Sequence, residues 1–594
     1  METGKTATDP RLQKIVRGLK LRVWIAEVVR PSELQVTLCW AGLIGFLGAV
    51  ASFGFRELTE FVHWLFTQRI GDYASTFAAL PYWRRLITPA IGGLIAGAIL
   101  YAGTRFRRSK YTTDYMEAVV VGEGLIALRS SLMKCASAMF SIASGASIGR
   151  EGPLVQLSSL CSSLLARWQN WSRPRRRLLV ACGAAAGIAS AYNAPIGGAL
   201  FVADIVLGSM EMQIFGPLVF ASVIATLTMQ RFIGKEPLYA SAFELRSDWE
   251  ILPHVVLGLL LGFAAPWFLR LLRASERWFL KLGVPVYARM TIGGLIVGAL
   301  AIFSPNVAGN GYSSITNILH AEWFWPALAM ILACKLIATV ATFGSGAVGG
   351  VFTPTLLIGA SSGFLFGTLA RYLLGASVTS DPAVFALVGM GAFLAATTHA
   401  PVMAMLMIFE LSLDYQIILP LMLASVVAYY ISISIERRSI YSESLKRKGA
   451  SLFDDRLAHV RVADLLKPDP LAVLETARFR EIGQDFITHR FNYLYVVDPA
   501  RQFKGAISLH DIKAYLNDPA LADLVIARDV MRFDFPTIDR KTSIRDALQR
   551  FSEHEGERLP VVADAESGEL IGTVSKTDLI LALAHRDSEQ TQEK

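Results

Sequence analysis

Apolar segments that glycine or proline interrupts before they reach a full membrane span dominate this chain from about residue 36 to residue 435. A helix that crosses the bilayer needs roughly 20 apolar residues. The segment "ITPAIGGLIAGAILYAG" is near that length, whereas "GVFTPTLLIGASSGFLFG" and "GAAAGIASAYNAPIGGALF" are interrupted. Broken helices at membrane depth are tolerated only where the freed backbone is buried in protein or lines a polar cavity. The pattern therefore predicts an all-α polytopic membrane domain with a pathway through it.

The composition and the charge pattern support a membrane protein. Of the 594 residues, 53% are hydrophobic and 18% are charged, which is typical of a membrane domain with some soluble mass attached. The net charge of +8 does not indicate nucleic acid, because the basic residues gather beside apolar spans, where topology explains them. We interpret four basic blocks as cytoplasmic: 11–22, 105–110, 172–177 and 436–449. Residues 1–35 predict an amphipathic interfacial segment rather than a signal peptide, and the first span lies near Leu38 to Phe55.

An internal repeat with an offset of about two hundred residues organises the membrane domain. The segment "GASIGREGPLVQLSS" aligns with "GAVGGVFTPTLLIGA", which pairs Pro153 with Pro354. "GAAAGIASAYNAPIGGALFVADI" answers "GMGAFLAATTHAPVMAMLMIFEL", which aligns Asp204 with Glu410. "PLVFASVIA" answers "PLMLASVVA" further along each half. Paired broken helices predict a binding site near the midplane, and transporters with this feature commonly have inverted repeats.

A soluble domain starts near residue 450, where the composition becomes charged and mixed. This tail is itself duplicated, since "YLYVVDPARQFKGAISLHDI" parallels "RLPVVADAESGELIGTVSKTDL". Each copy predicts strand, turn, strand and helix, so the tail is α/β. The expected domains are residues 1–35, the membrane domain at 36–445, a linker at 446–458, and the two copies of the tail module at 459–517 and 525–587.

Pro153 and Pro354 each stand just inside an apolar run that follows several glycines. Proline suits the first turn of a helix, where its missing N–H costs nothing. Two helix N-termini would then point into the membrane, and their N–H groups attract anions without a full positive charge.

Glu151 precedes Pro153 by two residues, so its carboxylate can occupy the same attractive field as a permeating anion. Protonation would remove its charge and release it, which makes Glu151 a candidate gate. The alternative is that Glu151 only stabilises a helix start. Within a bilayer an ionisable residue is costly and is a functional candidate by default, so we favour the gate.

The segments "GREGP", "GVFTP", "NAPIGG" and the tyrosine of "SIYSESLKRKG" resemble the signatures of the chloride channel and chloride/proton exchanger (CLC) family, bacterial branch. The resemblance covers residues 36–445 and implies a homodimer with one pore in each subunit, in which Glu151 is the gating glutamate. It also implies that Val351 and Phe352 hold chloride through backbone N–H groups and that Tyr441 offers its hydroxyl. The loop around Glu151 completes the anion-binding set with Gly149, Arg150 and Gly152.

The family's glycine-rich segment that supplies an inner serine is missing, and "YTTDYMEAV" stands in its place. Alignment on Glu117 puts Thr113 at the serine position, and a threonine hydroxyl can donate equally well. Asp114 near an anion path would repel anions.

Exchangers of the family carry two consecutive acids after the "NAP" segment, and the second passes protons; here the pair reads Asp204-Ile205. Isoleucine cannot carry a proton. The alignment with Glu410 favours a structural role for Asp204, although Asp204 is also a candidate for the proton route. Chloride/proton antiport and passive conduction through a voltage- or pH-gated chloride channel therefore both fit, with antiport slightly preferred.

The tail resembles the paired CBS module that many members of the family carry on the cytoplasmic side. Ser508 with Asp511 and Ser575 with Asp578 follow a strand in the pattern "GxxSxxD". In CBS pairs this position can bind an adenine nucleotide, the one candidate cofactor here, whereas helix capping explains the same residues and is preferred.

A divalent cation transporter regulated by CBS modules is the alternative from another class. It would need clustered oxygen ligands, and the three membrane carboxylates Glu151, Asp204 and Glu410 are not clustered. An enzyme is disfavoured, because no nucleophile and base pair or metal-ligand set has a recognisable spacing. The expected partners are chloride, protons, membrane lipid and a second copy of the chain, without nucleic acid. The expected location is a bacterial inner membrane, crossed several times, with the CBS tail in the cytoplasm.

Overall fold

The computed structural model describes residues 33–104, 112–120, 122–169, 171–239, 247–321, 323–441, 461–468, 470–489, 493–512, 524–542, 546–547, 550–551, 558–564 and 567–578. The chain forms two compact units, Met1–Lys448 and Gly449–Lys594. The predicted N-terminal segment, apart from residues 33–35, and the linker at 446–458 lie outside the described residues, as do the basic blocks at 11–22 and 105–110.

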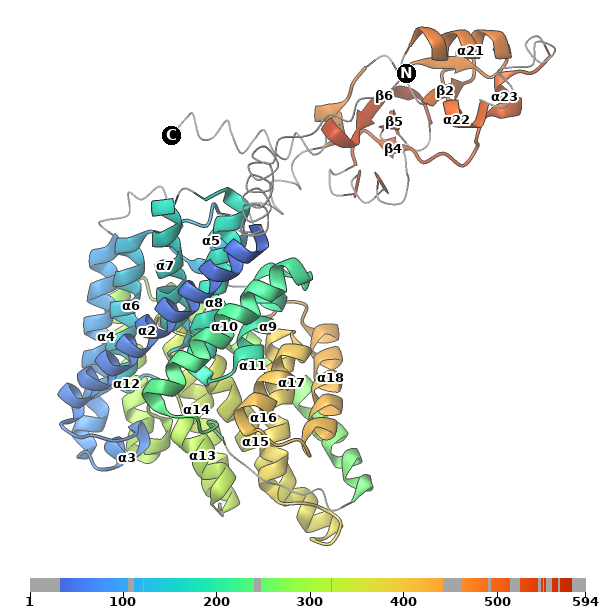
Figure 1. Ribbon diagram of the computed structural model, residues 1–594. Coiled ribbons are helices and arrows are strands. Elements are labelled where there is room, and N and C mark those ends of the chain that lie inside the picture. Colours follow the sequence, from blue (N-terminus) through green and yellow to red (C-terminus); the bar gives the residue numbers. More distant parts are fainter. Residues whose placement is uncertain are drawn as a thin grey trace, which may run out of the picture. The chain divides into compact units, whose positions relative to one another are not determined.

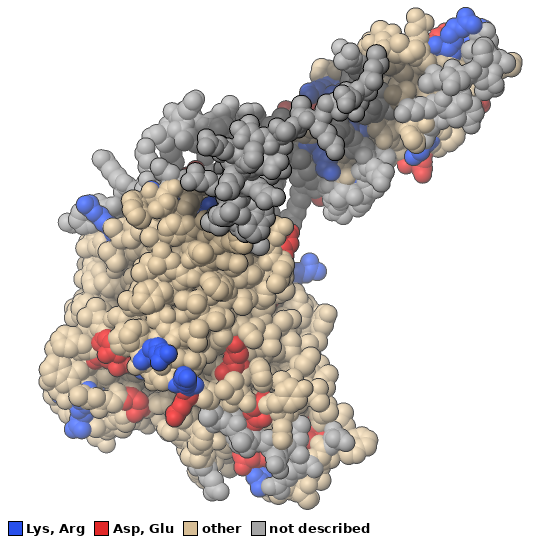
Figure 2. Space-filling view, in the orientation of Figure 1, with Lys and Arg blue, Asp and Glu red and all other residues tan. Residues whose placement is uncertain are grey.

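Unit one is helical, as its apolar segments predict (Figure 1). Among its described residues, eight helices are long and apolar enough to cross a membrane. They are α2 (Glu33–Thr67), α4 (Tyr82–Thr104), α10 (Met212–Ile233), α11 (Ile251–Lys281), α12 (Val286–Phe303), α14 (Trp325–Gly344), α15 (Phe352–Leu374) and α18 (Ile418–Ile435). Figure 2 shows a wide expanse without charged side chains on the visible face of this unit, with charged residues below it and at its upper edge. This is the surface that a lipid-embedded domain requires.

Other elements, most of them shorter, complete unit one. They are α3 (Tyr73–Ala78), α5 (Tyr115–Val120), α6 (Leu128–Ala143), α7 (Glu151–Gln169), α8 (Arg173–Tyr192), α9 (Pro195–Leu200), the π-helix η1 (Phe201–Leu207), the 3₁₀ turns η2 (Asp248–Glu250) and η3 (Pro305–Val307), α13 (Tyr312–His320), α16 (Pro382–Thr398) and α17 (Pro401–Ser412).

The internal repeat predicted from the sequence recurs in the backbone. Helix α8 ends at Asn193, whose φ of 55° is left-handed, and α9 then begins at Pro195. Helix α16 ends in the same way at His399, with a φ of 60°, and α17 begins at Pro401. A left-handed residue ends a helix, and proline then starts the next one at its first position. Both breaks therefore follow from the local sequence, and α9 and α17 pack together (Figure 1).

The segment "GVFTPTLLIGASSGFLFG" is not interrupted, contrary to the sequence expectation. It lies in the continuous helix α15, which packs on α16. A Cβ at Gly359 would lie 2.5 Å from the carbonyl oxygen of Gly389, and Gly363 meets the backbone at Phe385 in the same way. These glycines therefore allow two backbones to approach closely, as small residues do between membrane helices.

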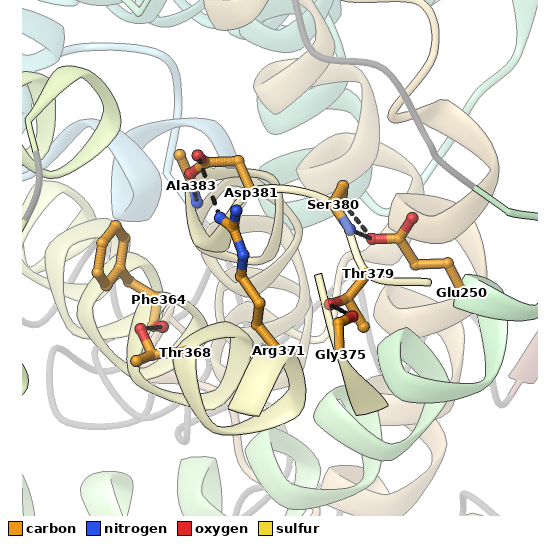
Figure 3. Close-up of polar contacts among 9 residues, drawn as sticks. All are labelled: Glu250, Phe364, Thr368, Arg371, Gly375, Thr379, Ser380, Asp381 and Ala383. Atoms are coloured by element: carbon orange, nitrogen blue, oxygen red, sulfur yellow. Dashed lines mark hydrogen bonds and ion pairs between the residues drawn. The ribbon is translucent and has the colours of Figure 1, made fainter. Parts of the chain in front are cut away.

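The connection between α15 and α16 is held by polar contacts (Figure 3). The amide of Ser380 donates to the carboxylate of Glu250 at 2.6 Å, and the Ser380 hydroxyl donates to the same oxygen. Asp381 caps α16 by accepting from the amide of Ala383 at 3.0 Å, and Arg371 lies 3.8 Å from Asp381. Glu250 is fully buried, so the membrane domain holds a carboxylate beyond the three that the sequence indicated.

Unit two contains two similar three-stranded sheets. The first joins β1 (Ala472–Leu474), β2 (Tyr493–Val497) and β3 (Phe503–Ser508), and the second joins β4 (Ile538–Asp539), β5 (Arg558–Val562) and β6 (Leu570–Ser575). In each sheet the first pair is parallel, the second is antiparallel, and the antiparallel register shifts once. The helical elements are η5 (Val462–Leu465), α21 (Phe479–Thr488), α22 (Leu509–Ile512) and α23 (Ala527–Val530). The predicted duplicated α/β tail is thus confirmed, with an additional parallel strand in each copy.

Candidate functional site

The two halves of unit one meet where α7 and α15 begin. The alignment that pairs Pro153 with Pro354 also pairs Gly149 with Gly350, and these two residues form an isolated antiparallel bridge. The amide of Gly149 donates to the carbonyl of Gly350 at 2.7 Å, and the amide of Gly350 donates back at 3.1 Å. Two equivalent residues that exchange bonds in both directions are related by a local two-fold axis. The repeats are therefore inverted about this bridge.

Both helices begin two residues before their aligned prolines, α7 at Glu151 and α15 at Phe352. The first intrahelical bond of α15 runs from the amide of Thr355 to the carbonyl of Val351 at 2.9 Å. The N–H groups of Val351 and Phe352 precede it and are free of intrahelical bonds. This end of α15 thus has the two donors that anion binding requires.

Glu151 is 3% exposed and makes an asymmetric set of contacts. Its Oε1 accepts from the hydroxyl of Tyr192 at 2.5 Å and from the hydroxyl of Thr353. Its buried Oε2 has no hydrogen-bond partner within the described part of the chain. A Cβ at Gly149 would collide with this carboxylate, so a larger residue there would displace the carboxylate from its present position. Tyr192 and Thr353 were not found from the sequence, because they meet Glu151 only through tertiary packing.

Arg150 faces away from the carboxylate of its neighbour. Its guanidinium carbon lies 5.0 Å from the centre of the Tyr312 ring, and it lines a cavity of about 670 Å³ together with Glu57 and Glu60. Arg150 does not line the cavity that contains Glu151. The charged pair in "GREGP" therefore points to two separate spaces.

Glu151 and Gly152 line a second cavity, of about 150 Å³. A third cavity, of about 290 Å³, includes Val351. The two share six lining residues: Asp114, Lys134, Val348, Gly349, Gly350 and Tyr441. The side chain of Phe352 lines neither, because it is buried against Tyr192 with ring centres 4.9 Å apart.

Tyr441 lies between these cavities, with its ring edge-on to Phe201 at 5.2 Å between ring centres. It is half-buried. The remainder of its motif, from residue 442 on, lies outside the described residues. The ring is therefore positioned by Phe201, next to the space that an anion would enter.

The segment that replaces the family's glycine-rich loop is held by Lys134 of α6 and by Gln156 of α7. The ammonium of Lys134 donates to the carbonyl of Thr113 at 2.8 Å and to its hydroxyl at 3.0 Å. Gln156 accepts from the amide of Tyr115 at 3.1 Å. Thr113 lines neither cavity, whereas Asp114 and Lys134 line both. Lys134, which the sequence did not single out, thus brings a cation to the place where Asp114 alone would repel anions.

Asp204 and Glu410 occupy aligned positions but have different surroundings. The two carboxylate oxygens of Glu410 accept from the amides of Ile196 at 2.9 Å and Gly197 at 2.7 Å, which caps α9. Asp204 lies in the π-helix η1, and its carboxylate makes no hydrogen bond with any described residue. The alignment predicts a shared structural role, and of the two acids Glu410 caps α9 whereas Asp204 caps no described amide. π-Helical turns occur frequently at functional sites.

In unit two, the residues of the "GxxSxxD" patterns cap short helices. The Ser508 hydroxyl accepts from the amide of His510 at 3.1 Å. The Ser575 hydroxyl accepts from the amide of Asp578 at 3.0 Å and donates to its carboxylate at 2.5 Å. Lys467 lies 2.8 Å from the Asp578 carboxylate. The side chain of Asp511 lies outside the described residues.

The described residues hold no group of three or more His, Cys, Asp or Glu side chains suited to a metal ion.

Comparisons with known proteins show which families the two units resemble. The sequence model of the voltage gated chloride channel family matches residues 92–433, and the CBS domain model matches residues 462–518 and 527–585. A ClcB-like protein of Ralstonia nicotianae is 48% identical over 415 residues, which cover 69% of this chain and 96% of the relative. A voltage-gated ClC-type chloride channel, ClcB, of Citrobacter koseri is 39% identical over 410 residues, which cover 68% of this chain and 97% of the relative.

Two solved structures share the fold. One is a slow cyanobacterial Cl⁻/H⁺ antiporter, with a TM-score of 0.62 and 25% identity, covering 70% of this chain and 98% of that chain. The other is a eukaryotic CLC transporter, with a TM-score of 0.60 and 18% identity, covering 91% of this chain and 97% of that chain.

Proposed function

The chain belongs to the voltage gated chloride channel family, and from this membership we propose that it carries chloride across a membrane in exchange for protons, with Glu151 as the gate. The observation that carries the proposal is the buried carboxylate of Glu151 at the start of α7, lining the same small cavity as the glycines that lead into α15. A carboxylate there competes with a permeating anion for the same helix-terminal field.

Each step of the proposed chloride path involves particular residues. Chloride enters from the cavity that contains Lys134 and Val351, and the N–H groups of Val351 and Phe352 bind it with the help of the Tyr441 hydroxyl. The charged Glu151 blocks the passage toward the cavity of Arg150. When Glu151 takes up a proton it loses its charge, leaves the field of the helix terminus, and allows the anion to pass.

Coupling to protons needs a second proton-carrying group, and we assign it to Asp204. Its carboxylate has no hydrogen bond with a described residue, and it lies in a π-helical turn close to Phe201, which contacts Tyr441. Ile205 cannot take this role. Passive conduction remains the second candidate function, favoured by Ile205 and by the description of the Citrobacter koseri relative as a channel.

We propose further that two copies of the chain assemble in a bacterial inner membrane with the CBS tails in the cytoplasm. The basic block at 172–177, at the start of α8, supports this orientation. Thr113 would act on the anion through Lys134. Adenine nucleotide at Ser508, Asp511, Ser575 and Asp578 is a proposed regulatory ligand, and its binding would require Lys467 to share or release Asp578. We assign no enzymatic activity.

The decisive experiment measures external pH around proteoliposomes that hold the purified full chain under an imposed chloride gradient, with and without a potassium ionophore. Proton movement driven uphill by chloride, abolished in Glu151→Ala and Asp204→Asn, would establish exchange through both carboxylates. Chloride flux without proton movement would establish a channel. Absence of chloride flux in vesicles of verified protein content would overturn the anion function.

A further inference from the structure

We propose that the hydroxyls of Tyr192 and Thr353 form a latch that holds the charged Glu151 gate closed and thereby sets the pH at which chloride flow begins. The inference rests on the proposed function of Glu151 as the gate. It assigns positioning roles to two residues that do not themselves bind the anion.

The latch consists of groups that are rigidly placed and dry. Tyr192 is the last residue of α8, directly before the left-handed Asn193, and Thr353 is the second residue of α15. Both side chains are 0% exposed. The Tyr192 ring packs against Phe352, with ring centres 4.9 Å apart, so its hydroxyl cannot follow the carboxylate far.

The two hydroxyls converge on a single oxygen of the gate. The Tyr192 oxygen lies 2.5 Å from Oε1 of Glu151, Thr353 contacts the same Oε1, and the two hydroxyl oxygens are 3.0 Å apart. Tyr192 belongs to one repeat and Thr353 to the other. The contact therefore joins the two halves through the gate itself.

The number of hydroxyl hydrogens available for donation determines whether the latch favours the charged or the protonated Glu151. Each hydroxyl has one hydrogen to donate, so a charged Glu151 uses both, and the contact between the hydroxyls then has none. Hydrogen bonds to a carboxylate are roughly twice as strong as those between neutral groups. A protonated Glu151 would be held only by the weaker kind. The latch consequently stabilises the charged, closed gate more than the protonated gate.

Other charged and titratable groups surround Glu151, and the test must separate them from the latch. Those within electrostatic reach are Arg150, Tyr239, Tyr312 and Tyr441, while Asp114 and Lys134 line the same cavity. The hydroxyl of Tyr239 is buried and has no hydrogen-bond partner among the described residues, whereas the hydroxyl of Tyr312 interacts with those of Thr353 and Tyr192. Tyr239→Phe is therefore a matched control that removes a nearby buried hydroxyl without touching the latch.

The experiment measures chloride efflux from proteoliposomes as a function of pH for wild type, Tyr192→Phe, Thr353→Val and the double variant. Protonation opens the gate, so loss of a donor to the charged form should move the half-maximal pH upward, toward neutral. One hydrogen bond to a charged group corresponds to about one to two pH units. The double variant should shift further, and Tyr239→Phe should keep the wild-type midpoint. In a Glu151→Gln background, removal of either hydroxyl should leave the pH profile unchanged.

The possible results separate failure of the latch from failure of the proposed chloride transport function. A wild-type protein that moves chloride, with midpoints unmoved or lowered in both single variants, overturns the latch alone. A wild-type protein that moves no chloride overturns the proposed function and the latch with it. Should Tyr192→Phe fail to give a monodisperse protein, Thr353→Val decides, because it preserves the side-chain volume at a helix start.

Discussion

Gly149 and Gly350 donate a backbone hydrogen bond to each other, at 2.7 and 3.1 Å, across the boundary between the two halves of the membrane domain. The proposed gate and the proposed anion-binding amide both lie next to this contact, because Glu151 closely follows Gly149 and Val351 directly follows Gly350. A change that separates the two strands should therefore disturb gate and anion site together.

Gly349→Ala is expected to abolish chloride transport while leaving the chain folded. The new Cβ would lie 2.9 Å from the carbonyl oxygen of Gly149 and 2.7 Å from Ile148, and a backbone oxygen cannot rotate away as a flexible side chain can. Chloride efflux and size-exclusion profile check this together. Normal efflux from the variant would mean that the bridge is not needed for transport.

Gly359→Ala should destabilise the membrane domain by about 1–3 kcal/mol, the usual cost of overpacking a tight contact. Its Cβ would lie 2.5 Å from the carbonyl oxygen of Gly389, so α15 and α16 must move apart. Gly216→Ala is the control, because no atom lies within 4 Å of its Cβ and helix propensity favours alanine by about 1 kcal/mol. The midpoint temperature of thermal unfolding in detergent should be lower in Gly359→Ala than in wild type, and it should not be lower in Gly216→Ala.

Glu410→Gln should lower the thermal stability of the membrane domain, whereas Asp204→Asn should impair the coupling of chloride to protons. Loss of one carboxylate oxygen leaves an amide at the start of α9 without its acceptor, at a cost of about 1 kcal/mol or more. Asp204 caps no described amide, so Asp204→Asn should keep the thermal midpoint and lose proton movement. If instead Asp204→Asn unfolds early and still exchanges protons, Asp204 is structural and the proton route lies elsewhere.

Lys467→Met should make the CBS tail more sensitive to acid. Partial burial alone would raise the pKa of the Asp578 carboxyl, but the hydrogen bonds from Lys467 and Ser575 and the lysine's charge hold that pKa below its ordinary value. The stability they contribute is present above the unfolded value of about 3.9 and is lost as the pH falls through the lower folded value.

Limited proteolysis of the full chain at graded pH measures this effect, since cleavage of the tail should begin at a higher pH in Lys467→Met than in wild type. Lys576→Met removes the same charge two residues from Asp578, without an ion pair to any described residue. Equal acid sensitivity of the two variants would show that net charge, and not the contact with Asp578, is responsible.

The sequence was sufficient for those features that depend on local patterns. Prolines after glycine-rich turns predicted where α7 and α15 begin, and repeated segments predicted the paired breaks at Asn193 and His399. It was insufficient where a role depends on a distant partner. The glycines of α15 suggested an interruption, because nothing in that segment reveals that Gly359 packs on another backbone. Thr353 stands inside "GVFTP" and Tyr192 directly before "NAPIGG", yet their convergence on one oxygen is set by the packing of two repeats.

The different surroundings of Asp204 and Glu410 escaped the sequence for a related reason. Alignment places the two acids at the same position of the repeat and favours one role for both. The π-helical turn that carries Asp204 has no counterpart in α17, and a π-helix has no sequence signature of its own. The hydrogen bonds to α9 therefore distinguish what the alignment could not.

The two-fold bridge between Gly149 and Gly350 also constrains how such a protein could have evolved. Glu151 and Phe352 are the first residues of the two equivalent helices, so in an ancestor made of identical halves they were the same residue. Two carboxylates facing each other across that axis in a dry space would repel strongly, and two aromatic rings would leave no gate. The two halves of this chain differ at this position, where one carries an acid and the other an aromatic side chain. Only one of the two equivalent helix starts therefore carries a titratable side chain.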